Sequence, residues 1–502
     1  MRYSALKRAG FVLPTRLSAA MSSAYEGGSA TGSRSRNWNP SGAGPNSAAT
    51  SNLSTIRRRA RDAVRNDPWA KVAVTRWVSN VVGTGIQPYP RHPDKGVRQA
   101  LKELWVDWEV DADADGRLSF YGLQALAVRA IFTDGEALAR IRYRRPQDRL
   151  AVPLQIQSLE SDFLPVEHSI PLAGGHEVVN GVEFNAIGQR VGYHLWAAHP
   201  SEMHRGVNQQ LRRVNADQVV HAYPVLRAGQ VRGVSELATV LLRLKTLDNF
   251  DDAVAFRQEV SNLFSGYVVR KDDEFGDIDP TKEAPVGEDM GVDYDGTPII
   301  GMEPGSITDL PHGTDVKFST PPGAPDNYAE FMRQQLMAAF ASVGIPYELA
   351  TGDLRNVSDR TLRVIVNEFH RLIEQFQWTV FIHQWCRPIW NAWIDAVALS
   401  GSIPMRYLDQ LKYRRVLWVP EGWPYFNPVQ DVKANTDAIR AGLVSRTAVI
   451  LAQGEDPEEV IEQIESDNKH ADEKGLSLDS DSRFAKNKGI NDDGEPSAAH
   501  ID

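Results

Sequence analysis

A long stretch of helical pattern, residues 327–400, constrains the fold of this chain more than any other feature. Apolar residues recur at helical spacing over 328–343 and again, after a loop, over 362–380. Gly344 and Pro346 end the first helix, because glycine permits a left-handed turn and proline cannot continue the helix. The stretch therefore predicts two helices joined by a loop.

The second helix, over 358–400, would be roughly 60 Å long at about 1.5 Å per residue. We expect a bend near Gln384, because the ring of Pro388 would strike its carbonyl. A helix of this length must bury its apolar stripe against another long helix, either of the same subunit or of a neighbouring one. The pattern alone leaves both possibilities open.

Size and composition indicate a folded protein with more than one domain. The chain has 502 residues, of which 42% are hydrophobic and 24% charged. The formal net charge of −10 argues against tight binding of nucleic acid, because that affinity comes mainly from lysine and arginine at phosphates. It is compatible with a protein that lets nucleic acid pass. No run of 18 apolar residues is present, so we predict no membrane span.

Motifs that would indicate an enzyme or a metal site are incomplete. Cys386, the one cysteine, lies in an apolar helical pattern and is interpreted as a buried packing residue. Asp111, Asp113 and Asp115 imitate a calcium loop, but Gly122 stands where the acid of the twelfth position is required. The phosphate-binding loop, the zinc-protease pair and the nucleophile elbow are also missing. We expect no catalytic residue, no metal and no cofactor.

The remaining segments alternate between helical and strand-like patterns, which predicts an α+β protein. Alternation over 139–144 predicts a strand, and 154–159, 182–184 and 191–196 continue one small antiparallel sheet. A helix of about thirty residues should follow Gly233, since apolar residues there recur at helical spacing.

Both ends of the chain have compositions typical of disorder. Residues 22–52 are rich in Ser, Gly, Ala and Asn and read as a mobile arm, and residues 468–502 are polar and acidic. Between the two long helical patterns, residues 266–325 contain many glycines, prolines and acids and predict short strands and turns.

A cluster of arginines opens the ordered part of the chain: Arg57, Arg58, Arg59, Arg61 and Arg65. One interpretation is a solvated helix face. Another is contact with phosphate or with an acidic partner, and an intersubunit salt bridge is a third. The sequence does not decide between them.

Several short motifs, taken in order, resemble those of the portal proteins of lambda-like tailed bacteriophages, from about Tyr25 to about Ile464. The segments that carry the resemblance are 57–67, 81–86, 113–119, 134–136, 221–223, 229–235, 304–310, 344–353, 358–360 and 442–445. Each motif is short, and the resemblance depends on their order and spacing along the chain. The chain departs from its relatives before the long helix, where residues 356–360 read Asn-Val-Ser-Asp-Arg and relatives often have Tyr-Ser-Ser-Arg.

The resemblance implies a portal-type subunit of a dodecameric ring at one capsid vertex. Such a ring is the channel for packaging and ejection of double-stranded DNA and docks the terminase and the head–tail adaptor. Major capsid and scaffold proteins are further implied partners, and no membrane is involved. The implied location is the virion, after assembly in the host cytoplasm. Alternatives are another head–tail connector or minor capsid protein and, from a different class, a packaging enzyme.

The resemblance also divides the chain into the parts of a portal subunit. The implied parts are a mobile arm (1–52), an α+β wing (53–232), a stem helix (233–265), a clip-like module (266–325), a second stem helix (326–343), a tunnel loop (344–357), a long kinked helix (358–400), a helical crown region (401–467) and a disordered acidic tail (468–502). Twelve stem helices at roughly 10 Å spacing would put their axes about 19 Å from the centre and leave a hole near 28 Å, wide enough for a duplex.

The tunnel loop supplies the candidate DNA-channel residues. They are Arg355, Asn356, Ser358 and Arg360. These side chains could touch or steer DNA phosphate at a constriction. Equally, they could cap the long helix and pair with Asp353 or Asp359.

Overall fold

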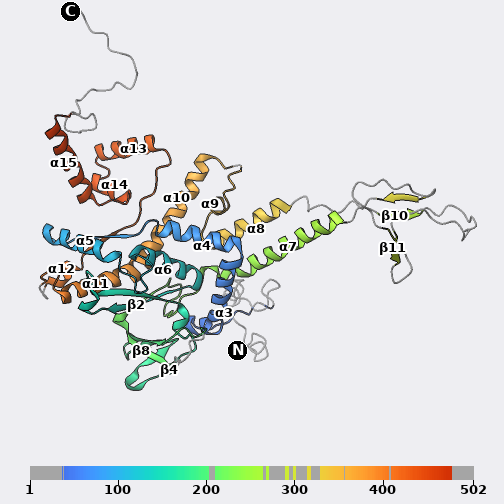
Figure 1. Cartoon of the computed structure of the whole chain (residues 1–502), viewed down its shortest axis with the longest axis horizontal. Coiled ribbons are helices and arrows are strands. Elements are labelled where there is room, and N and C mark those ends of the chain that lie inside the picture. Colours follow the sequence, from blue (N-terminus) through green and yellow to red (C-terminus); the bar gives the residue numbers. More distant parts are fainter. Residues whose placement is uncertain are drawn as a thin grey trace, which may run out of the picture.

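The computed structural model describes residues 37, 39–202, 210–263, 328–355, 357–405 and 409–476, together with four short strands between 267 and 317. Most of the predicted clip-like module, much of the predicted arm, the end of the predicted tail and Asn356 lie outside these residues. Within them the fold is mixed α+β, mostly helical with small antiparallel sheets, which confirms the predicted class (Figure 1).

Helices of the N-terminal part are α3 (Pro45–Asn66), α4 (Pro68–Val81), α5 (Lys95–Glu109) and α6 (Phe120–Asp134). Asp67 separates the first two, because its carboxylate caps α4 by accepting from the backbone N–H of Trp69 and Ala70 at 2.8 and 3.0 Å. The structured chain thus begins before Leu53, where the predicted arm ends. Asn46 explains the earlier start, since its side chain donates to the carbonyl of Gly229 at 3.0 Å.

Strands between residues 137 and 222 form two separate sheets where the sequence predicted one. The first has the order β3 (Leu154–Leu159), β2 (Ala137–Tyr143), β9 (Val219–Ala222). The second has the order β4 (Ile170–Pro171), β5 (Glu177–Val179), β6 (Val182–Phe184), β7 (Arg190–Trp196), β8 (Leu211–Asn215). The single-sheet prediction is wrong because β9 takes the free edge of β2, with Ala139 opposite Val220, so β6 and β7 pair with other partners.

Two helices lie side by side and project from the body of the molecule toward β10 (Figure 1). They are α7 (Leu241–Leu263) and α8 (Tyr328–Ser342). Phe250 of α7 packs against Tyr328 and Phe331 of α8 with ring centroids 6.0 and 5.0 Å apart. At their far end, β10 (Tyr267–Arg270) pairs with β13 (Thr314–Lys317), and β11 (Asp289–Val292) pairs with β12 (Pro298–Ile300).

The helix predicted to start after Gly233 begins later, at Leu241, after a 3-10 turn over Glu236–Thr239. Ser235 anchors this turn, because its hydroxyl donates to the carbonyl of Phe132 at 3.2 Å and accepts from the N–H of Leu237 at 3.1 Å. The chain is therefore fixed to the end of α6 before it turns into α7.

The long helix over 358–400 consists of three segments with different hydrogen bonding. They are α10 (Asp359–Phe376), the π-helical η7 (Gln377–Cys386) and α11 (Arg387–Ser400). Pro388 lies in the first turn of α11, where the N–H of Arg387 already bonds to the carbonyl of Ile382, five residues back. A wider turn thus occupies the region where we expected a proline bend near Gln384.

The stripe of α10 is buried by the same chain. Val366, Phe369 and Ile373 are its buried residues, and Phe376 meets Trp77 of α4 at 5.5 Å between ring centroids. Val364 on the same helix is 65% exposed. An intramolecular partner therefore covers most of this stripe.

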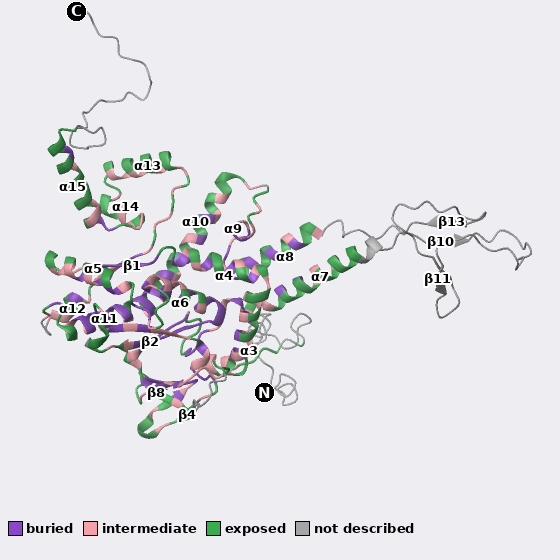
Figure 2. Ribbon diagram, in the orientation of Figure 1, coloured by how far each residue is buried: buried purple, intermediate pink, exposed green. Residues whose placement is uncertain are grey.

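A cluster of tryptophans fills one end of the core, around α5, α11 and β14 (Val416–Val419), which pairs with β1 (Gln87–Pro90). Its members are Trp105, Trp108, Trp390, Trp393 and Trp418. The ring centroids of Trp105 and Trp393 are 5.1 Å apart. Cys386 lies fully buried on η7, as predicted, and burial raises the pKa of its thiol. Figure 2 shows the buried residues concentrated in α6, α11 and β2.

The C-terminal helices contribute little to this core. They are α12 (Gln410–Tyr413), α13 (Pro428–Arg440), α14 (Arg446–Ala452) and α15 (Pro457–Lys474). No residue of α13 or α14 is buried. The predicted disorder is wrong for residues 468–474, because α15 continues to Lys474 and ends at Gly475, which has a φ of 65°. None of the described helices has the length and apolar character needed to cross a membrane.

Candidate functional site

The loop between α9 (Tyr347–Thr351) and α10 contains three of the candidate channel residues, with Arg360 following in α10, and Asp353 organises the loop. Gly352 ends α9 in the left-handed region, with a φ of 73°. The Asp353 carboxylate then accepts from the hydroxyl of Tyr347 at 3.1 Å and from the guanidinium of Arg355 at 2.7 and 2.8 Å. These bonds fold the loop back onto α9.

Arg333 of α8 ties the same loop to the projecting helices. Its Nε lies 3.8 Å from Asp353, and its guanidinium carbon lies 5.7 Å from the centroid of the Tyr347 ring. The bonded Arg355 guanidinium holds the pKa of Asp353 well below its usual range. The loop therefore carries an ionised aspartate between two arginines.

The structure places the four predicted residues in different settings. Arg355 pairs with Asp353 yet stays 73% exposed at its side chain. Ser358 caps α10, because its hydroxyl accepts from the backbone N–H of Thr361 at 3.2 Å. Arg360 is exposed and makes no ion pair among the described residues. Asn356 lies outside the described residues.

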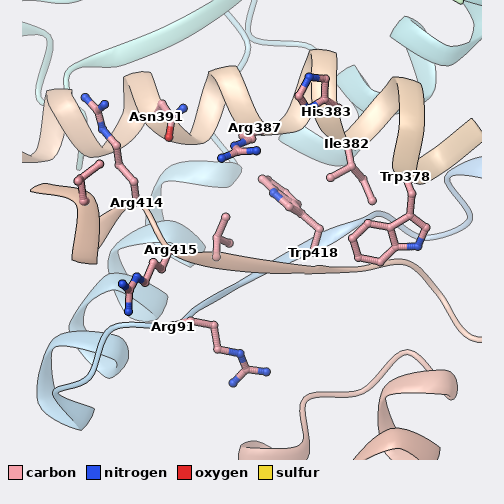
Figure 3. Close-up of a pocket in the computed structure, with 11 residues that line it drawn as sticks. Arg91, Trp378, Ile382, His383, Arg387, Asn391, Arg414, Arg415 and Trp418 are labelled. Carbon is pink, nitrogen blue, oxygen red and sulfur yellow. The ribbon is translucent and has the colours of Figure 1, made fainter.

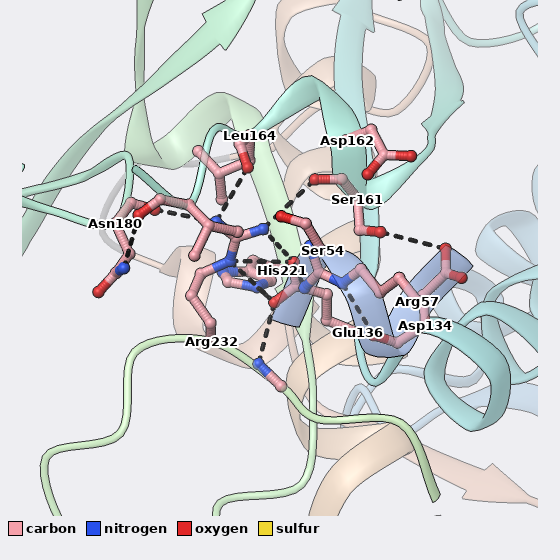
Figure 4. Close-up of polar contacts among 12 residues, drawn as sticks. Ser54, Arg57, Asp134, Glu136, Ser161, Asp162, Leu164, Asn180, His221 and Arg232 are labelled. Atoms are coloured by element: carbon pink, nitrogen blue, oxygen red, sulfur yellow. Dashed lines mark hydrogen bonds and ion pairs between the residues drawn. The ribbon is translucent and has the colours of Figure 1, made fainter. Parts of the chain in front are cut away.

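A second polar centre forms around a buried carboxylate, Glu136, which joins several distant segments of the chain (Figure 4). It accepts from Arg57 at 2.7 Å, from Nε of Arg232 at 3.0 Å, from the Gly233 backbone at 2.9 Å and contacts Nε2 of His221 at 3.1 Å. Arg57, Glu136, His221 and Arg232 are all buried. Four motifs that are separate in the sequence thus meet at one carboxylate.

Arg232 extends this network to the five-stranded sheet. Its Nη1 donates to the carbonyls of Leu164 and Asn180 at 2.9 and 3.0 Å. Arg57 likewise donates to the carbonyl of Asp134 at 3.0 Å. Because each buried guanidinium has several acceptors, the cost of burying the charges is largely offset.

The pKa values in the network move in the direction that keeps the ion pairs. Burial acts to raise the pKa of Glu136, but the charges of Arg232 and Arg57 outweigh it and lower that pKa well below the usual value. Burial lowers the pKa of His221 to about 4, against the opposing effect of Glu136. The network therefore holds an ionised glutamate and a neutral histidine at neutral pH.

Two glycines allow the network to close. A Cβ on Gly233 would lie 1.9 Å from the carbonyl oxygen of Gly135. Gly135 itself has a φ of 93° and meets the backbone of Val234, so a side chain fits at neither position.

The interpretation of the arginine cluster as a solvated face is wrong for Arg57 and Arg61. Arg57 is 1% exposed, and Arg61 pairs with Asp134 at 2.7 Å and with Asp162. Arg58, Arg59 and Arg65 are exposed, as that interpretation requires. The sequence signal for buried partners of these arginines was the 134–136 motif, which contains Asp134 and Glu136.

The segment that imitates a calcium loop is a capped turn. The Asp113 carboxylate accepts from the backbone N–H groups of Asp115, Arg117 and Leu118 at 3.0 to 3.1 Å. Aspartate at the start of such a turn satisfies backbone donors, which explains the resemblance to an ion-binding loop.

Within the described part of the chain, one group has the spacing of metal ligands: Glu160, Asp162 and His199. Arg61 already contacts both carboxylates, with Nη1 3.3 Å from Glu160. A guanidinium thus supplies the positive charge at the place where a cation would bind.

Comparison with known proteins gives a consistent result. A family model described as "Phage portal protein, lambda family" matches residues 31–377. The probable portal protein of Halomonas phage phiHAP-1 is 26% identical over 469 residues, which cover 89% of this chain and 88% of the relative. Portal protein B of Escherichia phage lambda is 18% identical over 496 residues, with 88% of each chain covered.

Solved structures with similarity to this chain include the neck of a native gene transfer agent particle computed with C12 symmetry. It is 14% identical, has a TM-score of 0.44, and the match covers 81% of this chain and 94% of that one. An HK97 family phage portal protein from Corynebacterium diphtheriae is 11% identical with a TM-score of 0.29, and the match covers 61% and 83% of the two chains.

Proposed function

The chain belongs to the lambda family of phage portal proteins, and on that premise we propose that it forms a closed, dodecameric ring through which DNA is packaged and later ejected. As a portal protein it is a structural, non-enzymatic component of the virion at the head–tail connection. The ring, its channel and its docking roles are the proposal.

The apolar surface left on α7 and α8 carries the proposal. Leu242 and Phe256 lie about four turns apart on nearly the same face of α7, and they are 74% and 66% exposed. On α8, Met337 is 43% exposed. Exposed apolar side chains along a projecting helix pair favour contact with another copy. A closed ring uses such a flank against a different face of the next subunit.

The domain division follows from the same arrangement. We assign α7 and α8 to the stem, the α+β body from α3 to β9 to the wing, and α13 to α15 to the crown region. The strands β10 to β13 lie at the outer end of α7 and α8 (Figure 1), which supports a clip-like module that docks the terminase and the head–tail adaptor. Major capsid and scaffold proteins would contact the outside of the ring.

The α9–α10 loop is the proposed channel constriction. Arg355 is exposed but paired, so it can meet a phosphate without the full attraction of a free arginine. Arg360, the second residue of α10, adds a charge without an ion pair among the described residues, and Asn356 and Ser358 complete the proposed set. A weak, repeated contact suits DNA that must slide in both directions.

Negative-stain electron microscopy of the purified chain tests ring formation. Closed rings with a central hole are expected at moderate concentration. A monodisperse monomer at every salt and protein concentration would overturn the ring.

Charge reversal tests the constriction. Arg355→Glu with Arg360→Glu should lower the DNA content of particles severalfold while rings persist, because repelled phosphates slow translocation. The matched control is Arg129→Glu with Arg212→Glu, two exposed arginines elsewhere on the body. Equal DNA content in the two double variants would remove these residues from the channel.

A further inference from the structure

A second basic feature lies away from the α9–α10 loop. It is a pocket of about 560 Å³ between the η7–α11 helix and β14 (Figure 3). Its lining includes Arg91, Arg387, Arg414, Arg415, Trp378 and Trp418. The volume falls within the range of small-molecule sites, roughly 300 to 1,000 Å³.

Positive charge exceeds negative charge in this pocket. Arg414 pairs with Asp395 at 2.6 Å, and Arg91 lies 3.6 Å from Asp456. Arg387 and Arg415 make no ion pair among the described residues, and both are exposed. Two guanidinium groups are therefore available to an anion.

The chemistry of these guanidinium groups favours a phosphate as that anion. Planar guanidinium groups bind the oxygens of phosphate especially well, because two N–H groups can donate in parallel.

An aromatic surface lies beside the basic groups. Trp378 is 50% exposed, whereas Trp418 is 4% exposed. Figure 3 shows Arg387 projecting from α11 into the space next to Trp418, with Trp378 at the other end of the pocket. An exposed indole near arginines offers a face on which a nucleobase can stack.

We propose that this pocket binds a nucleotide unit, with its phosphate at Arg387 and Arg415 and its base against Trp378. The ligand is either a free nucleotide or one nucleotide of a DNA strand, since both present the same phosphate and base. The site is separate from the proposed channel residues, and it does not require the ring.

Binding of dAMP, inorganic phosphate and a labelled single-stranded oligonucleotide to the full chain tests the proposal. Arg387→Gln with Arg415→Gln should weaken nucleotide binding about tenfold or more, because two charged hydrogen bonds are lost. For the oligonucleotide, the slope of log K against log salt should fall by about two. Trp378→Ala should weaken dAMP and the oligonucleotide but not inorganic phosphate.

The matched control is Arg129→Gln with Arg212→Gln, which removes the same charge from exposed positions elsewhere. It should leave affinity and slope unchanged. Oligonucleotide binding without dAMP binding identifies the DNA strand as the source, and dAMP binding without oligonucleotide binding identifies the free nucleotide.

Three results would overturn the proposal. One is that neither nucleotide ligand binds, and another is that the pocket and control variants bind equally. The third is that single subunits bind the nucleotide and assembled rings do not, because a neighbouring subunit would then fill the pocket. Failure to form rings has no bearing on the first two, so this test is independent of the proposed channel.

Discussion

Glu136 shows at the scale of single residues why separate short motifs belong together. Arg57, His221 and Arg232 lie 79, 85 and 96 positions from it in the chain, and all three contact its carboxylate. Removing one partner would leave a buried charge unpaired, which costs roughly 3 to 5 kcal/mol in comparable sites. The motifs are therefore parts of one structural unit.

His221 makes this unit sensitive to acid. Its pKa is about 4 in the folded chain against an ordinary 6.5, so between these values the unfolded chain binds a proton that the folded chain does not. The contribution of His221 to the free energy of unfolding is therefore fully present above about pH 6.5. It falls toward pH 4, by about 2 kcal/mol between pH 7 and pH 5. Glu136, with its lowered pKa, contributes in the same direction at still lower pH.

Urea unfolding at pH 7 and pH 5 measures this effect. His221→Gln should lose less stability between the two pH values than the unmodified chain, because glutamine does not titrate. The control His383→Gln changes an exposed histidine and should lose as much as the unmodified chain. An equal loss in all three proteins would show that His221 does not titrate on unfolding.

Local contacts of single residues could be predicted from the sequence, whereas distant ones could not. Sequence spacing suggested Ser358 as a helix cap and an ion pair between Arg355 and Asp353, and the structure has both contacts. Arg57 was interpreted from its neighbours on one helix. Nothing in that helical pattern indicates that its partner is Glu136, which follows α6 in the chain. Sequence spacing reports hydrogen bonds within a turn or two, and burial is decided by the tertiary fold.

At the scale of elements, periodicity located the helices but not their exact form. The stripe over 362–380 predicted a long helix, and Pro388 predicted a bend near Gln384. The structure has a π-helical segment over that position. Its π-helical form depends on distant groups: Gln377 donates to the carbonyl of Val81 at 2.8 Å, and Gln384 accepts from the N–H of Tyr223 at 3.1 Å. These partners lie too far away in the chain to be found from the local sequence pattern.

Strand patterns had the same limit. Alternation predicted strands at 139–144 and 154–159, and both formed as β2 and β3. Which sheet each later strand joined was decided by pairing across many residues, which alternation does not encode.

Ion pairs attach the last helix to the body. Lys95, Arg98 and Lys102 of α5 face Glu462, Glu458 and Glu459 of α15, with the first two pairs at 2.6 and 3.1 Å. Exposed pairs are individually weak, and salt screens them strongly. Among the described residues α15 buries only Pro457 and Ala471, so this charged contact supplies much of its attachment to the body.

Hydrogen exchange of α15 should therefore depend on salt. Exchange is expected to speed up severalfold between 50 mM and 500 mM NaCl, while amides of α6 stay protected. Lys95→Gln with Arg98→Gln should give fast exchange already at 50 mM. Exchange of α15 that is the same at both salt concentrations would rule out an electrostatic attachment.

At the scale of the whole molecule, the projecting α7–α8 pair has an apolar flank that the described residues do not cover. Leu242→Asp should prevent ring formation in electron micrographs, while the urea midpoint of the subunit changes little, because an exposed side chain contributes within about 0.5 kcal/mol to stability. Ile187→Asp is the matched control, since Ile187 is 85% exposed but lies on the five-stranded sheet's β6–β7 loop. Rings from both variants would place the subunit contact elsewhere.

The tryptophan cluster at the end of the core has a practical consequence. Trp105, Trp390 and Trp393 lie within contact of one another and away from water, so their ultraviolet emission should report the integrity of this core without any added label. Assembly through α7 and α8 would leave that signal nearly constant. One sample could then distinguish loss of fold from loss of association. Tryptophan emission intensity would report the fold, and light scattering would report the association.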